Sequence, residues 1–268
     1  DMKRITSARC INCIPEVVPK KRSNNKKLKL LITNKRIDWG FKQSILMIQS
    51  RLQQIMRRTG DKVLLITSTI PAEGKTMTSV NMALAFAQEG MKVALLDGDL
   101  RKPSVSELMK LPEGPGLTEY FRGESTPEEI QVVKDGVTFF RAGQKKGKVS
   151  GLIDEEKMNS LLEKLRKEYD VILMDAAPSY VFSDAMILSS YADKVLYVVR
   201  VDKADAKEIR VGMNSFEEKE KLIGYVINHD TGGYISQSGY GYGRYGKYQK
   251  YRKYAELDEE TMNTEDTL

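Results

Sequence analysis

The sequence has few of the residues that build metal centres and no run long enough for a membrane span. Its 268 residues include two cysteines and one histidine. Cys10 and Cys13 form a lone C-x-x-C with no second pair, and His229 is remote, which argues against zinc and leaves a reduced pair or a redox role. The longest apolar runs are strand-sized, far below the ~20 residues of a membrane-spanning helix, and nothing resembles a cleavable signal. We therefore expect a soluble domain.

Positive charge is concentrated at the N-terminus. Residues 1–36 contain eleven Lys and Arg against two acidic residues, whereas the whole chain has a net charge of +6. Each basic residue near an anionic leaflet contributes about 1 kcal/mol of binding. We predict a basic juxtamembrane arm at 1–36, with a solvated linker as the alternative. The hydrophobic content of 41% suffices for one domain, at 37–232, followed by a tail at 233–268.

Apolar runs of strand length alternate mostly with helical patterns, which predicts an α/β fold. The runs are nearly continuous in apolar residues, as in strands that are covered on both faces. The fold class is therefore a parallel sheet sandwiched by helices. The predicted strands are 63–67, 93–97, 137–142, 171–175, 194–200 and 222–228, and helical patterns include 155–168 and 183–191.

A phosphate-binding loop is predicted after the first of these strands. Residues 67–76 read TSTIPAEGKT, and helix-forming residues follow up to a glycine stop at Gly90. Thr69 replaces the first glycine of G-x-x-x-x-G-K-[ST], but the strand–loop–helix context supports the motif. Such a loop presents backbone N–H groups to an anion, so Lys75 would reach phosphate and Thr76 would bind Mg²⁺. We expect the Lys75 side chain to face solvent without nucleotide. The predicted ATP contacts in the loop are Ala72, Glu73, Gly74, Lys75, Thr76 and Met77.

Acidic residues end two further predicted strands. Asp97 and Asp99 belong to DGDLR at 97–101, and Asp175 begins DAAP at 175–178. Ligands of parallel sheets bind at the carboxyl ends of the strands, and Mg²⁺ prefers oxygen ligands. The sequence therefore predicts an ATP–Mg²⁺ site at this edge.

The C-terminal tail is rich in tyrosine. Seven tyrosines lie between Tyr234 and Tyr254, among glycines and without an apolar period, which predicts a mobile segment with an acidic end. Phenols beside an ATP–Mg²⁺ site are possible phosphoryl acceptors. The alternative is stacking on single-stranded nucleic acid, although nothing else in the chain indicates a nucleic-acid fold. The predicted acceptors are Tyr240, Tyr242, Tyr245, Tyr248, Tyr251 and Tyr254.

These motifs resemble those of the bacterial tyrosine kinases of capsule and exopolysaccharide export, relatives of the Min- and Par-type P-loop ATPases. The family carries T-S-x-x-P-G-E-G-K-[ST], then D-x-D-x-R and D-x-x-P, each after three apolar residues, and the match covers about residues 40 to 255. The resemblance implies an ATP-dependent protein-tyrosine kinase that phosphorylates its own tail in trans and regulates polysaccharide polymerisation and export.

Roles of single residues also follow from the resemblance. It implies that Lys75 contacts phosphate, that Asp99 and Asp175 organise magnesium with Thr76, and that Asp97 accepts the phenol proton. The alternative for Asp97 is that it only arranges water around the metal. Asn228 would lie near the adenine, or simply begin a loop.

The resemblance further implies where the protein acts and with what. We expect it on the cytoplasmic side of the bacterial plasma membrane, with a transmembrane polysaccharide co-polymerase as activator, a tyrosine phosphatase, and further copies of itself in a ring. The ring motif E-x-x-R-x-x-R is replaced by Gln43, Leu46 and Gln49, so that contact is in doubt. Ser104 occupies the place of an internal activating tyrosine, which favours dependence on a separate activator.

The loop also departs from the family pattern. Ala72 replaces the family's second loop glycine and is strained if its φ is positive. Two competing functions stay open, a Min- or Par-like switch ATPase and a catalytically silent nucleotide-binding scaffold. Min- and Par-like ATPases usually have a second lysine at the position of Ile70, so this residue argues against the first of them.

Overall fold

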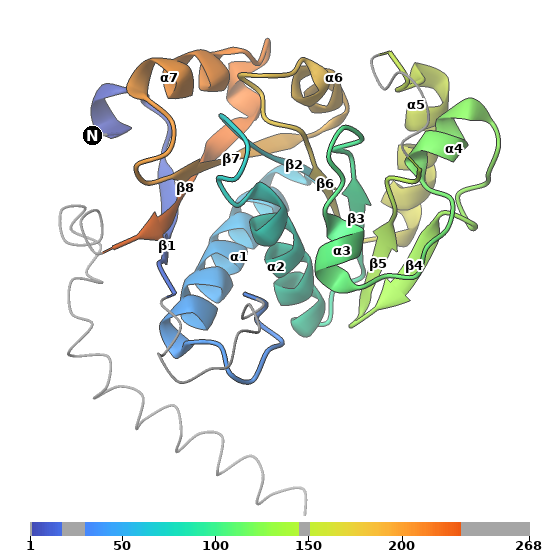
Figure 1. The fold of residues 1–268 in the computed structure, drawn as a ribbon, viewed down its shortest axis with the longest axis horizontal. Helices are drawn as coiled ribbons and strands as arrows, with labels where there is room; N and C mark the ends of the chain where they lie inside the picture. The colour runs from blue at the N-terminus through green and yellow to red at the C-terminus, as the bar shows by residue number, and fades with distance from the viewer. Residues whose placement is uncertain (1, 18–29, 145–150, 232–268) are drawn as a thin grey trace, which may run out of the picture. The chain divides into compact units, whose positions relative to one another are not determined.

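The computed structural model describes residues 2–17, 30–144 and 151–231, and the statements below concern these residues (Figure 1). The predicted tyrosine-rich tail, and the run of basic residues at 20–29, lie outside them. None of the described helices is long and apolar enough to cross a membrane.

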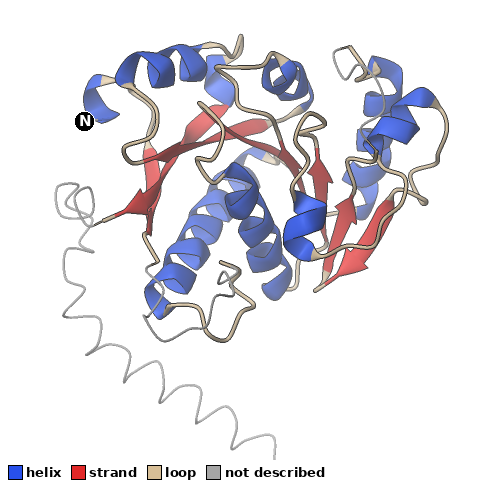
Figure 2. Cartoon of the chain, in the orientation of Figure 1, coloured by secondary structure: helices blue, strands red, loops and turns tan. Residues whose placement is uncertain are grey.

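A mostly parallel sheet forms the centre, and Figure 2 draws its strands in red. It has eight strands in the order β1-β8-β7-β2-β6-β3-β5-β4. The strands from β8 to β5 pair in parallel, and β4 pairs antiparallel with β5. The strands are β1 (Cys10–Pro15), β2 (Val63–Ser68), β3 (Val93–Asp97), β4 (Gln131–Lys134), β5 (Val137–Phe140), β6 (Val171–Asp175), β7 (Lys194–Arg200) and β8 (Leu222–Asp230). The predicted fold class is confirmed.

Helices cover both faces of this sheet. Figure 1 shows α1 and α2 on one side and α6 and α7 on the other. The helices are α1 (Trp39–Thr59), α2 (Lys75–Gln88), α3 (Val105–Met109), α4 (Leu117–Arg122), α5 (Glu155–Glu168), α6 (Asp184–Tyr191) and α7 (Ala206–Asn214), with short 3₁₀ turns at Met2–Arg4 and Lys219–Lys221. Central strands such as β2, β3 and β6 are buried at every residue, which explains why they read as continuous apolar runs.

The amphipathic pattern of α1 fixes one side of the core. Phe41, Ile45, Ile48 and Leu52 recur at helical spacing and are fully buried. Asp38 caps the helix, since its Oδ1 accepts the backbone N–H of Gly40 at 2.8 Å. The helix therefore presents one apolar stripe to the core, and it packs against β1 and α2.

The fold begins earlier than the predicted boundary at residue 37. β1 lies beside β8, the backbone N–H of Tyr225 donates to Arg9 O at 2.9 Å, and Arg51 from α1 donates to Ile11 O. The arm prediction is therefore wrong for residues 2–17. The high count of basic residues concealed a strand that buries Ile11 and Ile14.

Two further boundaries differ from the sequence analysis. The strand predicted at 137–142 ends at Phe140, because the carbonyl of Arg141 turns to accept the N–H of Leu117 at 2.7 Å. β4 was not predicted. It joins β5 through Asp135 and Gly136, both at positive φ.

Candidate active site

The phosphate-binding loop connects β2 to α2 at the carboxyl edge of the sheet. Gly74, the residue before the helix, has φ of 95°, and a Cβ on it would lie 2.1 Å from Asn228 Nδ2. Only glycine fits this position. Ala72 also has a positive φ, 68°, so the departure from the family glycine is strained rather than harmless.

Glu73 and Asn228 hold the loop in shape. The Glu73 carboxylate is fully buried and accepts the N–H of Ile70 at 2.8 Å and that of Arg200 at 3.2 Å. Burial raises the pKa of this carboxyl above its usual value. Asn228 Nδ2 donates to Glu73 O at 2.7 Å, and its Oδ1 accepts the N–H of His229. Both side chains thus bond to backbone of the loop and its neighbouring strands.

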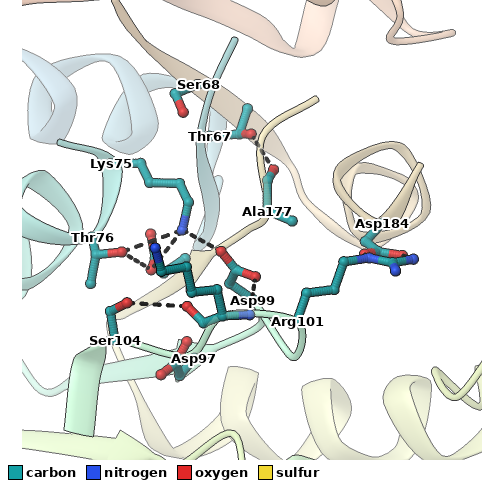
Figure 3. Close-up of polar contacts among 12 residues, drawn as sticks. Thr67, Ser68, Lys75, Thr76, Asp97, Asp99, Arg101, Ser104, Ala177 and Asp184 are labelled. Atoms are coloured by element: carbon teal, nitrogen blue, oxygen red, sulfur yellow. Dashed lines mark hydrogen bonds and ion pairs between the residues drawn. The ribbon is translucent and has the colours of Figure 1, made fainter. Parts of the chain in front are cut away.

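Lys75 points toward Asp99, which follows β3 (Figure 3), and also contacts Asp175 at the end of β6. Its Nζ lies 2.7 Å from Asp99 Oδ2, 3.5 Å from Asp175 Oδ2 and 3.3 Å from Thr76 Oγ1. Only 9% of the residue is exposed, so the prediction of a solvent-facing lysine is wrong. Burial alone would lower the pKa of Lys75, but Asp175 and Asp99 outweigh it and raise the pKa above the usual value. The lysine is therefore held as a cation.

Asp175 is fully buried, and both of its oxygens accept hydrogen bonds. Thr76 Oγ1 donates to Oδ2 at 2.7 Å, and Ser79 Oγ donates to Oδ1 at 2.9 Å. Burial raises the pKa of Asp175, while Lys75 and the two hydroxyls oppose that rise. Ser79 was not predicted from the sequence. Its position one helical turn after Lys75 was the available signal.

Asp97 lies beneath this cluster and keeps one free oxygen. Its Oδ2 accepts the N–H of Val105 at 3.1 Å, and its buried Oδ1 has no hydrogen-bond partner in the described part of the chain. Burial, reinforced by the charge of Asp175, raises the pKa of Asp97 well above its usual value. A carboxylate with a raised pKa and a free oxygen is a competent proton acceptor.

Arg101, the last residue of the DGDLR segment, ties that segment to α6. Its guanidinium forms an ion pair with Asp184 and lies 4.6 Å from the ring centroid of Phe182. Lys102 N donates to Asp99 Oδ1 at 3.0 Å, so a hydrogen bond within the segment also fixes the Asp99 carboxylate. The sequence offered no signal for Asp184 or Phe182.

The residues fit a nucleotide with magnesium. The loop leads into the N-terminus of α2, whose backbone N–H groups can bind phosphate, and Thr76 offers a hydroxyl oxygen beside Asp175. Within the described ranges no three His, Cys, Asp or Glu side chains form a metal cage. Magnesium usually takes one or two carboxylates, water and substrate phosphate rather than such a cage. Thr76, with Asp99 and Asp175 directly or through water, is the fitting ligand set.

Other predicted positions lie away from this cluster. The Met77 side chain packs against the hydrophobic core. Leu46 also packs there and Gln49 is buried within α1, so neither is placed for the charged contact of the family ring motif. The predicted acceptor tyrosines lie outside the described residues.

Comparison with known proteins identifies the family. A P-loop NTPase family model of the ParA group, described as NUBPL iron-transfer P-loop NTPase, matches residues 60–211. The tyrosine-protein kinase CpsD of Streptococcus pneumoniae is 34% identical over 183 residues, which cover 63% of this chain and 78% of CpsD. The chain belongs to the bacterial tyrosine-protein kinases. The family predicted from the motifs is thus confirmed.

Solved structures and longer relatives of this kinase family agree. The kinase domain of Escherichia coli tyrosine kinase ETK superimposes with a TM-score of 0.75 and 26% identity, covering 83% of this chain and 90% of that one. The tyrosine-protein kinase ptk of Acinetobacter johnsonii is 27% identical over 75% of this chain, but the match covers only 27% of ptk. The chain therefore spans a minor part of that relative.

Proposed function

We propose that the protein is an ATP-dependent protein-tyrosine kinase that phosphorylates the tyrosines of its own tail, in trans. The observation that best supports this proposal is the cluster of Lys75, Thr76, Asp99 and Asp175 at the end of the phosphate-binding loop. A fixed cation beside the loop stabilises the charge that develops on a transferred phosphoryl group. Magnesium, when bound, would neutralise the phosphate oxygens.

Each residue has a task in this mechanism. The loop backbone and Lys75 would hold the phosphates of ATP, and Thr76 with Asp175 and Asp99 would hold the metal. The phenol oxygen attacks the γ-phosphorus, its proton passes to Asp97 Oδ1, and the bond to the β-phosphate oxygen breaks to release ADP. Asp97 is fully buried, so proton transfer requires a local rearrangement that brings its Oδ1 within reach of the phenol.

The acceptors in this proposal are Tyr240, Tyr242, Tyr245, Tyr248, Tyr251 and Tyr254. Each phosphate adds about −1.5 to −2 charges, which would reverse the sign of a stretch with five Lys and Arg residues between 239 and 254. The product tail would then be repelled from the site. The proposal includes a setting at the cytoplasmic face of the membrane, with a polysaccharide co-polymerase as activator, a tyrosine phosphatase as its opponent, and control of polymer export. A relative named as a tyrosine-protein kinase in the cps region of Klebsiella pneumoniae supports the link to such a locus.

Mass spectrometry after incubation with ATP and Mg²⁺ tests the activity. Wild-type protein should gain several phosphates on the tail tyrosines, and Lys75→Met protein should gain none. Mixing full-length Lys75→Met with an active protein that lacks the tail tests the trans route. Phosphate on the tail of the Lys75→Met partner supports it, whereas an unlabelled tail beside labelled wild type means intramolecular transfer. No phosphotyrosine in any sample, together with tight binding of nucleic acid to the tail, would overturn the proposal.

A further inference from the structure

Ser79 contacts the central carboxylate of the site although no motif includes it. It lies on α2, fully buried, with its hydroxyl 2.9 Å from Asp175 Oδ1 and 3.0 Å from the backbone oxygen of Lys75. A serine hydroxyl has one proton, and both neighbours are acceptors only. Because a hydrogen bond to a carboxylate is the stronger of the two, the proton is directed to Asp175.

The two oxygens of Asp175 therefore have separate partners. Oδ2 faces Lys75 and accepts the proton of Thr76, whose oxygen accepts from Lys75 Nζ at 3.3 Å and keeps a second lone pair for a cation. Oδ1 faces Ser79, the only hydroxyl that reaches it among the described residues. With both oxygens held, the carboxylate cannot rotate away from Thr76.

We propose that Ser79 is a positioning residue that fixes Asp175 for magnesium and thereby sets the magnesium dependence of nucleotide binding. This role rests on the proposed function. Outer-sphere hydrogen bonds of this kind commonly change metal affinity by about 10- to 100-fold. No water can replace the hydroxyl easily, since Ser79 and Asp175 are both fully buried.

Thr78 provides a matched control. It is the neighbouring residue on α2, equally buried, and its hydroxyl donates to Gly74 O at 3.0 Å in the same backward pattern, without a contact to Asp175. Thr78→Val and Ser79→Ala each delete one buried helical hydroxyl. Only Ser79→Ala deletes a donor to the carboxylate.

The test measures the affinity of the whole chain for ADP with and without Mg²⁺ by titration calorimetry. We expect Ser79→Ala to reduce the enhancement by Mg²⁺ about 10-fold or more, Thr78→Val to leave it unchanged, and Ser79→Thr, which keeps the hydroxyl, to restore it. Affinity without Mg²⁺ should be similar in wild type and Ser79→Ala.

Two results would overturn the role of Ser79. One is a wild-type enhancement in Ser79→Ala, and the other is an equal loss in Thr78→Val, which would indicate a general effect on α2. If the added methyl group of Ser79→Thr prevents folding, the Ser79→Ala and Thr78→Val pair still decides the question. If the ADP affinity of the wild-type chain is the same with and without Mg²⁺, both the proposed function and the role of Ser79 are overturned.

Discussion

Asn228 Nδ2 donates to Glu73 O at 2.7 Å, which joins the end of β8 to the phosphate-binding loop. The same amide nitrogen would lie 2.1 Å from a Cβ on Gly74. The close approach of loop and strand depends on the missing side chain. Asn228 therefore fixes the position of the phosphate-binding loop through Glu73 O.

Gly74→Ala should abolish nucleotide binding. The new methyl group collides with Asn228, and the φ of 95° costs an alanine about 1–2 kcal/mol of stability. Calorimetric titration with ATP measures the loss of nucleotide binding, and urea unfolding measures the loss of stability. The double variant Gly74→Ala/Asn228→Ala removes the collision but keeps the backbone strain, so it should recover binding only in part. Undiminished affinity in Gly74→Ala would show that the loop geometry is not required.

Ala72→Gly should raise stability slightly without changing the reaction. The alanine has φ of 68°, which costs about 1–2 kcal/mol of stability, and glycine removes that strain. Glycine also gives the unfolded chain more conformational entropy, which lowers stability by about 0.4–1 kcal/mol. The expected net gain is up to about 1 kcal/mol in urea unfolding. Gly90→Ala, at another positive φ of 78°, should instead destabilise. A loss of stability in Ala72→Gly would mean that other contacts favour the alanine.

Asp97→Asn should separate activity from stability. Loss of the base should slow phosphoryl transfer by about 10²–10⁴-fold while nucleotide binding persists. The folded protein holds the proton of Asp97 to a higher pH than the unfolded chain, so wild-type stability falls as the pH rises from 3.8 through the raised pKa. Asparagine does not titrate, so the Asp97→Asn variant does not lose stability in this way. The melting temperature of Asp97→Asn should exceed that of wild type by a difference that grows with pH, and a difference that stays constant with pH would contradict the raised pKa of Asp97.

Much of the site was predictable because its chemistry is local in sequence. Lys75 and Thr76 follow β2 directly, and Asp97 and Asp175 end strands whose apolar runs are unmistakable. The edge strands were harder. β1 is concealed by nearby basic residues, whereas the Asp135-Gly136 pair is a hairpin signal from which β4 could have been predicted. The spacing of Ser79 one turn after Lys75 places it on the same face of α2 but does not identify Asp175 as its partner. Phe182 and Asp184 contact Arg101 across the fold, and spacing along the chain gives no signal for such contacts.

Lys75→Met should cost stability as well as activity, because the lysine is buried between two carboxylates. Removing one member of a buried ion pair typically costs about 3–5 kcal/mol, since the other charge is left uncompensated. The pKa of Lys75 is raised, so its contribution is full below the usual lysine value of 10.5 and is lost only as the pH rises through the folded value. Urea unfolding at neutral pH measures the loss. Lys164→Met, which breaks an exposed pair with Glu128, should change stability far less.

The ion pair between Arg101 and Asp184 should matter for rate more than for affinity. Arg101 closes the segment that carries Asp97 and Asp99, and its guanidinium is held by Asp184 and by the ring of Phe182. In Asp184→Asn the segment is freed from α6, so we expect kcat to fall about 10-fold, as when a reacting group is held less precisely, with KM for ATP little changed. Steady-state assays of tyrosine phosphorylation measure both constants. Glu128→Gln, which breaks an ion pair remote from the site, should leave both unaltered. A rise in KM with kcat intact in Asp184→Asn would place Arg101 in nucleotide binding instead.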